Sequence, residues 1–407
     1  MYGKLLVGID IGSSEIKAVA FEADDKEELQ FLGEKTIKSK GVENGLIKNH
    51  NEAKDSITDL IKGLQELIGR QITEVYLSVP SGSCKLVPTR GEVDVINDEG
   101  IIEKRDIKRA REAAARIVTP YEYTYIQLIE HKYNLDEKMS TKNPYRMKGR
   151  KLELQGTAVL ISSKDYEEYL KLFQYINLEI AGFRISCEAA AELLIDDLDR
   201  NRGVVLVDCG KNKIDIAGFK DGKLQEVMQL SIGGNTITRD ISYCFKINED
   251  QAEEIKGFSG SPGDLSSNSS IDYEMLKEVI DARLLEMGEM IDRELKNSKY
   301  SADISNVIIY GKGISLFKNI ANRFSSINDR NVSFVSSELY DRINSKYINS
   351  RGLVNLVSNE LKWEYEKEKV VPNVIEENVI KNIRGKSKIT KKHGIVSKMK
   401  SILEDLF

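Results

Sequence analysis

Two short segments of this sequence place an aspartate at the end of an apolar run and a glycine two residues later. Asp10 and Gly12 end the run that starts at residue 5, and Asp208 and Gly210 end the run that starts at residue 204. A glycine at a tight turn lets backbone N–H groups approach phosphate oxygens, and the carboxylate can hold a hydrated magnesium ion. One such turn could be an ordinary hairpin bend, but two facing turns would clamp a nucleotide.

The elements around the two turns repeat as well. When the aspartates are aligned, Ile16 matches Ile214, and each turn leads into an alternating apolar and polar segment, residues 16–21 and 214–219. We expect a further strand after each hairpin, at residues 29–37 and 224–232. The repeat predicts two α/β halves that begin alike, each with one phosphate-binding turn.

The composition narrows the class of protein. The 407 residues include 60 basic and 65 acidic ones, so the net charge of -5 gives no overall positive field that would favour nucleic acid. Four cysteines without a CxxC pair and only three histidines argue against zinc or disulfide frameworks and fit a reducing cytosol. The start of the sequence lacks the pattern of a signal peptide, and no run reaches the roughly 18 apolar residues of a membrane span. We therefore expect a cytosolic protein of two or three domains.

The end of the chain has a different character. We predict that residues 359–393 form a charged, flexible linker. The segment 381–400, which begins inside this linker, carries eight basic residues and no acid. Residues 394–407 then form a predicted amphipathic helix, whose polar face includes Lys398 and Lys400 and whose apolar stripe consists of Ile395, Val396, Met399, Ile402, Leu403, Leu406 and Phe407.

Such a helix needs a surface for its apolar face. An anionic membrane surface would attract the lysines and accept the stripe at the headgroup boundary without being spanned. A partner protein or the body of the chain itself are the two alternatives. One short helix binds a membrane only marginally, so we expect self-association to make the tether firm.

Several further motifs together resemble one family. The paired turns resemble the phosphate loops of the actin, Hsp70 and sugar-kinase superfamily. Residues 41–47 (GVENGLI) resemble a GVxNGxI segment of the FtsA cell-division proteins and lead into an expected helix, 51–68, and strand, 75–79. Three other stretches resemble FtsA motifs: 143–153 with NPxGMxGxxLE, 233–241 with GGxxITxDIA, and 252–256 with AExIK. The resemblance covers most of the chain and is thin over 300–380.

The resemblance implies an actin-like ATPase fold, an α/β architecture with two duplicated halves around a nucleotide cleft. Apolar residues at helical spacing over 271–297 support a helical lobe. The implied organisation is a first large subdomain (1–83 and 164–201), an FtsA-type inserted α+β subdomain (84–163), a second large subdomain (202–240 and 301–358), a helical subdomain (241–300), the linker (359–393) and the terminal helix (394–407).

The resemblance also implies which residues hold ATP. Asp10 and Asp208 would hold Mg2+ through water, and the helical lobe would contribute Glu253 and Lys256, although these two could equally be a solvated helix pair. Glu188 is a conceivable water-positioning carboxylate, but a surface helix glutamate is the favoured interpretation. The remaining candidate ligands are Gly12, Ser13, Ser14, Lys17, Gly210, Asn212, Lys213, Gly233, Gly234, Gly311, Lys312 and Gly313.

Two of the loops depart from the family pattern. Lys211, Asn212 and Lys213 stand where the pattern DxGGGTTD has two glycines and a threonine, and Lys312 interrupts the glycine run of a third loop. Bulk and the loss of easy positive φ would hinder backbone contact with phosphate at these positions. Either the lysines supply charge where glycines supplied N–H donors, or the site is degenerate and at most a weak ATPase.

By resemblance, the chain is a division scaffold that binds ATP and Mg2+, polymerises, and tethers FtsZ to the cytoplasmic face of the cell membrane at the septum, with other division proteins as partners. The alternatives are a kinase or chaperone ATPase of the superfamily and a PilM-like pilus-assembly protein. No motif marks a sugar pocket, and no length remains for a chaperone's substrate domain. The altered loops leave a divergent paralogue open.

Overall fold

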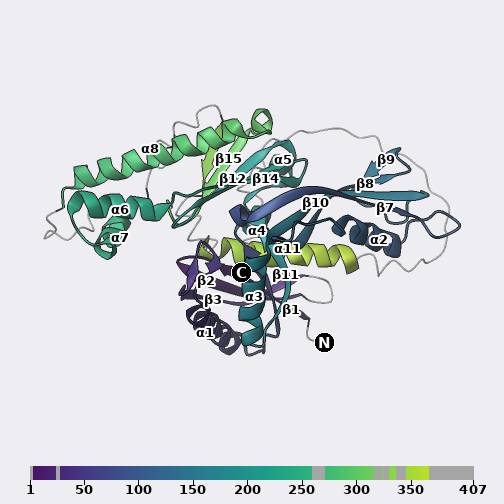
Figure 1. Cartoon of the computed structure of the whole chain (residues 1–407), viewed down its shortest axis with the longest axis horizontal. Helices are drawn as coiled ribbons and strands as arrows, with labels where there is room; N and C mark the ends of the chain where they lie inside the picture. The colour runs from purple at the N-terminus through teal and green to yellow at the C-terminus, as the bar shows by residue number, and fades with distance from the viewer. Residues whose placement is uncertain are drawn as a thin grey trace, which may run out of the picture.

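The computed structural model of the chain describes residues 3–23, 28–258, 271–314, 317, 324, 330–335 and 345–365. The predicted terminal helix, residues 394–407, and most of the predicted linker lie outside the described residues. Figure 1 shows the first sheet with its helices at the bottom, a second sheet above it, a lobe of helices on the left and a third sheet on the right.

The first sheet contains the first Asp-x-Gly turn. Its strand order is β11-β6-β1-β2-β3, with β1 antiparallel to β2 and parallel to β6. The strands are β1 (Lys4–Ile11), β2 (Glu15–Ala23), β3 (Leu29–Lys38), β6 (Glu74–Val79) and β11 (Glu179–Ile185). A small hairpin of β4 (Val42–Glu43) and β5 (Leu46–Ile47) precedes the helix α1 (His50–Ile68).

The second sheet repeats this arrangement. Its order is β14-β13-β12-β15-β16, with β12 antiparallel to β13 and parallel to β15. The strands are β12 (Val204–Cys209), β13 (Ile214–Lys220), β14 (Lys223–Leu230), β15 (Asn306–Tyr310) and β16 (Asn331–Phe334). The duplication predicted from the two turns is thereby confirmed in the topology of the sheets.

Helices cover both faces of the first sheet. Alternate residues of a strand point to opposite faces, and in β1 Val7 and Ile9 pack with α1 while Leu6 packs with α11 (Ile348–Tyr365). The other helices of this half are α3 (Ser163–Tyr175) and α4 (Ser186–Leu194). Burial of β1 on both faces explains why its sequence is a nearly continuous apolar run.

The helix α11 lies where the sequence had not placed it. Residues 348–358 were assigned to the second half and residues 359–365 to the linker, but α11 continues to Tyr365 and packs against β1 and α4 of the first half. Gly352 permits the close approach, because a Cβ there would lie 1.9 Å from the carbonyl oxygen of Ala189. The buried residues Leu353, Val354 and Val357 fix the helix on this face.

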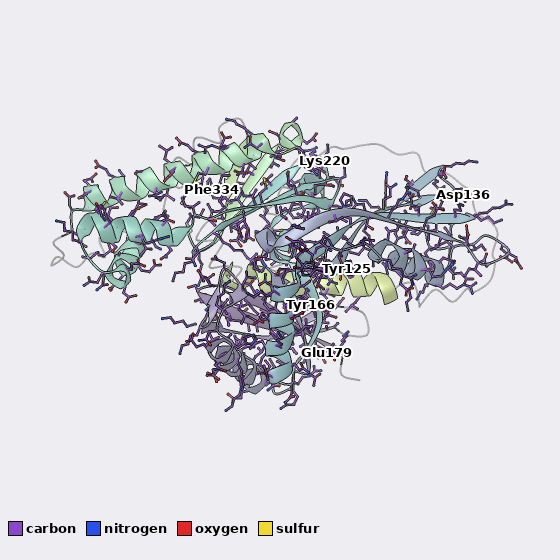
Figure 2. All side chains as sticks on the ribbon, in the orientation of Figure 1. Tyr125, Asp136, Tyr166, Glu179, Lys220 and Phe334 are labelled. Carbon is purple, nitrogen blue, oxygen red and sulfur yellow. The ribbon has the colours of Figure 1, made fainter. Side chains whose placement is uncertain are left out.

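The third sheet lies between β6 and α3 in the sequence. Its order is β7-β10-β8-β9, formed by β7 (Cys84–Asp94), β8 (Tyr123–Leu135), β9 (Met139–Thr141) and β10 (Lys151–Ser162). The helix α2 (Lys104–Ala115) packs against it through Ile107, Ala110 and Ala114. Figure 2 shows Asp136, just after β8, at the outer tip of this sheet and Tyr125 near its inner end.

The lobe of helices follows the second sheet. It contains α6 (Gly234–Phe245), α7 (Glu249–Phe258) and α8 (Tyr273–Asn297), and the short helix α5 (Asp197–Arg202) precedes the second sheet. The predicted apolar stripe of α8 is buried with the second sheet, except for Val279, which is half-buried, and Met275, which is exposed. Among the described residues, no helix has the length and apolar character needed to cross a membrane.

Candidate nucleotide-binding site

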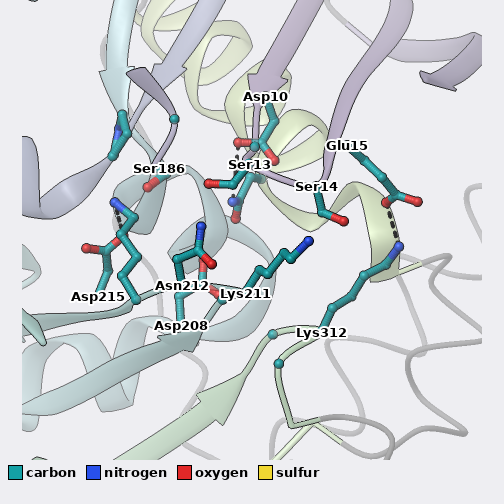
Figure 3. Close-up of a pocket in the computed structure, with 18 of the residues that line it drawn as sticks. Asp10, Ser13, Ser14, Glu15, Ser186, Asp208, Lys211, Asn212, Asp215 and Lys312 are labelled. Carbon is teal, nitrogen blue, oxygen red and sulfur yellow. Dashed lines mark hydrogen bonds and ion pairs between the residues drawn. The ribbon is translucent and has the colours of Figure 1, made fainter. Parts of the chain in front are cut away.

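A cavity of about 770 Å³ lies between the two halves, and both Asp-x-Gly turns line it. A cavity of this size is within the range of small-molecule sites. Figure 3 shows Asp10, Ser13 and Ser14 on one side and Asp208, Lys211 and Asn212 on the other. All of the predicted nucleotide ligands line the cavity except Gly233, which lies directly behind the second turn: a Cβ there would be 2.7 Å from the carbonyl oxygen of Gly210.

The first turn is closed by a hydrogen bond from the Gly12 N–H to the Glu15 carbonyl oxygen, 3.1 Å long. The Asp10 carboxylate beside it has three polar neighbours. Its Oδ1 accepts hydrogen bonds from the Ser78 hydroxyl at 2.7 Å and the Asn349 amide at 3.5 Å, and its Oδ2 is 3.6 Å from Lys17 Nζ. Strands β1, β2 and β6 and the start of α11 therefore all position this carboxylate.

The second turn has the same backbone bond, from the Gly210 N–H to the Lys213 carbonyl oxygen at 2.9 Å. Neither Lys211 nor Asn212 has a positive φ. The expectation that lost access to positive φ would hinder backbone contact with phosphate was therefore wrong, because this turn does not use that conformation. What the substitutions change is the side chains that the turn presents to the cavity.

Asp208, at the end of β12, differs from its counterpart in the first turn. Burial raises its pKa to about 7, and the nearby charges of Asp215 and Asp10 add to the shift. Asp215 lies directly opposite Asp208 in the β12–β13 pairing, and it forms an ion pair with Lys213, whose Nζ is 3.0 Å from Asp215 Oδ2. Repulsion between close carboxylates is relieved when a cation lies near them.

The third loop, residues 310–314, packs on the second turn. Gly311 has a φ of 114°, and a Cβ there would lie 2.5 Å from the Cys209 carbonyl oxygen. A Cβ on Gly313 would lie 2.4 Å from the Gly210 carbonyl oxygen. Lys312 points away from this contact, and its Nζ is 2.5 Å from Glu15 Oε2, which belongs to the first half (Figure 3). The ion pair thus crosses the cleft.

Glu253 and Lys256 of α7 belong to a hydrogen-bonded cluster and are not a solvated helix pair. Lys256 is only 3% exposed, and its Nζ donates to the Gly234 carbonyl at 3.2 Å, the Thr238 hydroxyl at 2.8 Å and Glu253 Oε2 at 2.6 Å. Burial lowers the pKa of Lys256. Burial alone would raise the pKa of Glu253, but hydrogen bonds from Lys256 and Thr238 bring it below its usual value. Lys256 therefore positions α6 and Glu253 at the edge of the cavity.

Glu188 corrects a prediction. The favoured interpretation was a surface glutamate, but its carboxylate accepts a hydrogen bond of 2.7 Å from Gln127 Nε2 of the third sheet, and burial raises its pKa. It is not among the residues that line the cavity. Its neighbours come from a distant strand, which the local sequence pattern of α4 could not reveal.

The sequence also missed residues that line the cavity. The turn of the β4–β5 hairpin contributes Asn44 and Gly45, which lie inside the recognised GVENGLI segment but had not been assigned a role. Lys346 belongs to the 3-10 turn η5 (Ser345–Tyr347), and Asn349 belongs to the start of α11, which follows it. No local motif marks these two, because only the packing of α11 on the first sheet brings them to the cleft.

These residues fit a nucleotide with magnesium. Two turns of N–H groups and the serine hydroxyls Ser13 and Ser14 suit phosphate oxygens, and lysines from both halves supply positive charge. Asp10 and Asp208 would hold the ion through its water ligands. The described residues include no group of three or more histidine, cysteine or acidic side chains that could hold a metal directly. A bound magnesium ion would neutralise the terminal phosphates.

Comparisons with known proteins identify the protein family of the chain. A model of the family "Cell division protein FtsA" matches residues 205–353, and a model of the SHS2 domain inserted in FtsA matches residues 82–160. Cell division protein FtsA of Borreliella burgdorferi is 28% identical over 344 residues, covering 80% of this chain and 83% of that protein. FtsA of Bacillus subtilis is 22% identical and covers 98% of both chains. The chain belongs to the FtsA family.

The solved structures that resemble this FtsA-family chain share its actin-like fold. A type IV pilus biogenesis complex of PilM and PilN matches with a TM-score of 0.61 at 15% identity, covering 87% of this chain and 98% of that one. MreB5 of Spiroplasma citri, bound to ADP, matches with a TM-score of 0.51 at 14% identity, covering 90% and 98%. At these identities the likeness concerns the fold alone.

Proposed function

We propose that this FtsA-family division protein binds ATP with Mg2+ between its two halves, polymerises, and tethers FtsZ to the cytoplasmic face of the cell membrane at the septum. The observation that carries the proposal is the cavity of about 770 Å³ onto which both Asp-x-Gly turns of an FtsA-family chain open. The structure of the actin-like neighbour MreB5 bound to ADP supports it.

Hydrolysis is at most a minor part of this function. The chain presents lysines at the second and third loops, and Lys312 is held by Glu15 at the mouth of the cleft. Glu188, the one carboxylate considered for positioning water, lies outside the cavity. The proposed role of the nucleotide is therefore to hold the two halves together in the form that assembles, with other division proteins added to the assembly.

The membrane contact rests on the sequence of the tail. Lysines that precede the apolar stripe of residues 394–407 suit an anionic lipid surface, at about 1 kcal/mol for each basic residue close to it. One such helix binds weakly, and an assembly of many copies multiplies the contact. The proposal is therefore that polymerisation is what makes membrane attachment firm. FtsZ is the partner that the assembly holds at the membrane.

A PilM-like role in pilus assembly is the second candidate. It is favoured by one observation, the TM-score of 0.61 to the PilM–PilN complex, which concerns the fold alone. The FtsA matches in both the second half and the inserted SHS2 region favour cell division.

Co-sedimentation with anionic vesicles and purified FtsZ tests the proposal. The full chain with ATP should sediment and carry FtsZ with it, and a chain that ends at Lys392 should leave both in solution. Leu403→Glu, in the apolar stripe, should release the protein, while Ser401→Glu, on the polar face, is the matched control and should retain it. Equal sedimentation of the full and shortened chains would contradict the tether, and sedimentation without FtsZ would contradict the partner.

A further inference from the structure

Asp215 of β13 connects the phosphate loops to the start of the third sheet, which is the inserted sheet of the FtsA-type subdomain. It is 6% exposed, and its Oδ1 accepts hydrogen bonds from Gln229 Nε2 at 2.9 Å and from the Gly82 N–H at 3.2 Å. Gly82 belongs to η1 (Ser81–Ser83), the 3-10 turn that joins β6 of the first sheet to β7 of the inserted sheet. One carboxylate of the second half thus holds the connection between the first half and the inserted sheet.

The turn η1 is a fixed joint and not a loose linker. Ser81 is fully buried, and its Oγ is 3.1 Å from Ser186 Oγ and accepts a hydrogen bond from the Cys187 N–H at 3.2 Å. Gly82 leaves room for Gln229, because a Cβ at position 82 would lie 2.5 Å from Gln229 Cβ. The strand β14, which carries Gln229, also contacts β7 itself. A change at Asp215 therefore reaches the inserted sheet through direct contacts.

Lys213 is the other partner of Asp215. Among the described residues, the ammonium group of Lys213 lacks hydrogen-bond acceptors. The Nζ atom is buried and makes no hydrogen bond of acceptable geometry in the described part of the chain. Within the described ranges it forms an ion pair with Asp215 Oδ2 at 3.0 Å. Lys213 also lines the cavity together with the residues of both phosphate turns. An ammonium group has three N–H donors, so a phosphate oxygen in the cavity would offer it the hydrogen bonds that it lacks.

We propose that Lys213 exchanges partners when a nucleotide binds, leaving Asp215 for a phosphate oxygen, and that this exchange couples the cleft to the inserted sheet. The inference rests on the proposed nucleotide binding and adds a role for Lys213 and Asp215. Without its counterion, the Asp215 carboxylate is a stronger acceptor and holds the Gly82 N–H and Gln229 more tightly. An occupied cleft therefore fixes η1 and the start of β7 more firmly on the second half.

Hydrogen–deuterium exchange of the full chain, with and without saturating ATP and Mg2+, tests this coupling at residues 80–86. In the unmodified chain, ATP should slow exchange there by between about twofold and tenfold, the range expected when one hydrogen bond is strengthened. Lys213→Met should abolish the ATP-dependent difference, and Lys213→Arg should retain it. The matched control is Lys220→Met at the far end of β13, the strand that Lys213 precedes, because the ion pair of Lys220 with Asp303 lies outside the cavity. This variant should retain the difference.

ATP affinity, measured by calorimetry on the same samples, separates the two proposals. If ATP binds but exchange at residues 80–86 does not change, or if Lys213→Met keeps the full difference, the coupling is wrong and nucleotide binding stands. If the unmodified chain binds no ATP, both are wrong. Should Lys213→Met fail to fold, Asp215→Asn provides the second variant, since it keeps an acceptor for Gly82 but removes the charge, and it too should abolish the difference.

Discussion

The first and second phosphate turns have the same backbone but opposite charges at the same place. In each, the glycine N–H bonds to the carbonyl oxygen three residues on, and the aspartate pairs across the hairpin with a residue seven positions later. That residue is Lys17 opposite Asp10 and Asp215 opposite Asp208. The first aspartate therefore faces a cation, and the second faces another acid that needs Lys213 to neutralise it.

The difference teaches that an Asp-x-Gly pattern encodes the turn but not its electrostatics. The first turn presents serine hydroxyls and an aspartate that is already paired. The second turn presents lysines and a half-buried aspartate. It is supported from behind by the third loop and the start of α6, where the Gly234 N–H bonds to the Gly210 carbonyl at 3.0 Å. Four experiments test this difference between the two turns.

The largest effect is expected from Gly311→Ala. A Cβ would collide with the Cys209 carbonyl at 2.5 Å and with Asp208 Oδ1 at 2.7 Å, and the φ of 114° disfavours any other residue. We expect a loss of about 3 kcal/mol in the free energy of unfolding, measured by denaturant titration. Gly257→Ala, where nothing lies within 4 Å of the added Cβ, is the control and should change little. Equal effects would show that the third loop does not support the second turn.

Lys256→Met should have the next largest effect. It removes three hydrogen bonds that hold Gly234, Thr238 and Glu253 behind the second turn. A loss of roughly 2 kcal/mol in unfolding free energy is expected, because buried acceptors lose their donor. Lys277→Met, at an exposed position of α8, should stay within about 0.5 kcal/mol of the unmodified chain. A result for Lys256→Met within that same margin would mean that the cluster is not structural.

Asp208→Asn should change how stability depends on pH. Because the pKa of Asp208 is raised to about 7 in the folded chain, the folded state holds a proton that the unfolded state releases near pH 4. Its stabilisation is complete below pH 4 and is lost as the pH rises towards 7. Relative to the unmodified chain, Asp208→Asn should therefore gain about 1–2 kcal/mol between pH 5 and pH 7 in thermal or urea unfolding. A constant difference over that interval would contradict the raised pKa.

The smallest effect is expected from the ion pair across the mouth of the cleft. Lys312 is half exposed, with 51% of its side chain accessible, so the pair with Glu15 should contribute less than about 1 kcal/mol. A double-mutant cycle of Glu15→Gln and Lys312→Met measures this coupling energy. The charge exchange Glu15→Lys with Lys312→Glu should restore most of it. A coupling of several kcal/mol would make the pair a main connection between the halves.

Much of the fold was predictable because it depends on local patterns. The aligned aspartates gave the duplicated hairpins, and the strand expected at 29–37 and the helix expected at 51–68 match β3 and α1 to within one residue. The strand expected at 224–232 ends at Leu230, because Gly233 and Gly234 begin α6. Apart from the corrected assignment of α11, the subdomain boundaries stay predictions, and so do the nucleotide roles of the candidate residues.

What could not be predicted depends on contacts between distant parts of the chain. Asn349 reaches Asp10 only because α11 packs on the first sheet. Glu188 accepts a hydrogen bond from a glutamine of the inserted sheet, 61 residues away in sequence. Lys312 forms an ion pair with Glu15 of the other half instead of extending into the open cleft. No composition or periodicity in the neighbourhood of these residues distinguishes them from ordinary surface side chains.

Calorimetric titration combined with a turnover assay measures whether this cleft binds ATP without rapid hydrolysis. The unmodified chain with Mg2+ should bind ATP, Asp10→Ala should bind at least about tenfold more weakly, and turnover should stay well below about 1 per second. An unchanged affinity in Asp10→Ala would remove that residue from the site. Faster turnover would contradict a scaffold that uses ATP to hold its halves together.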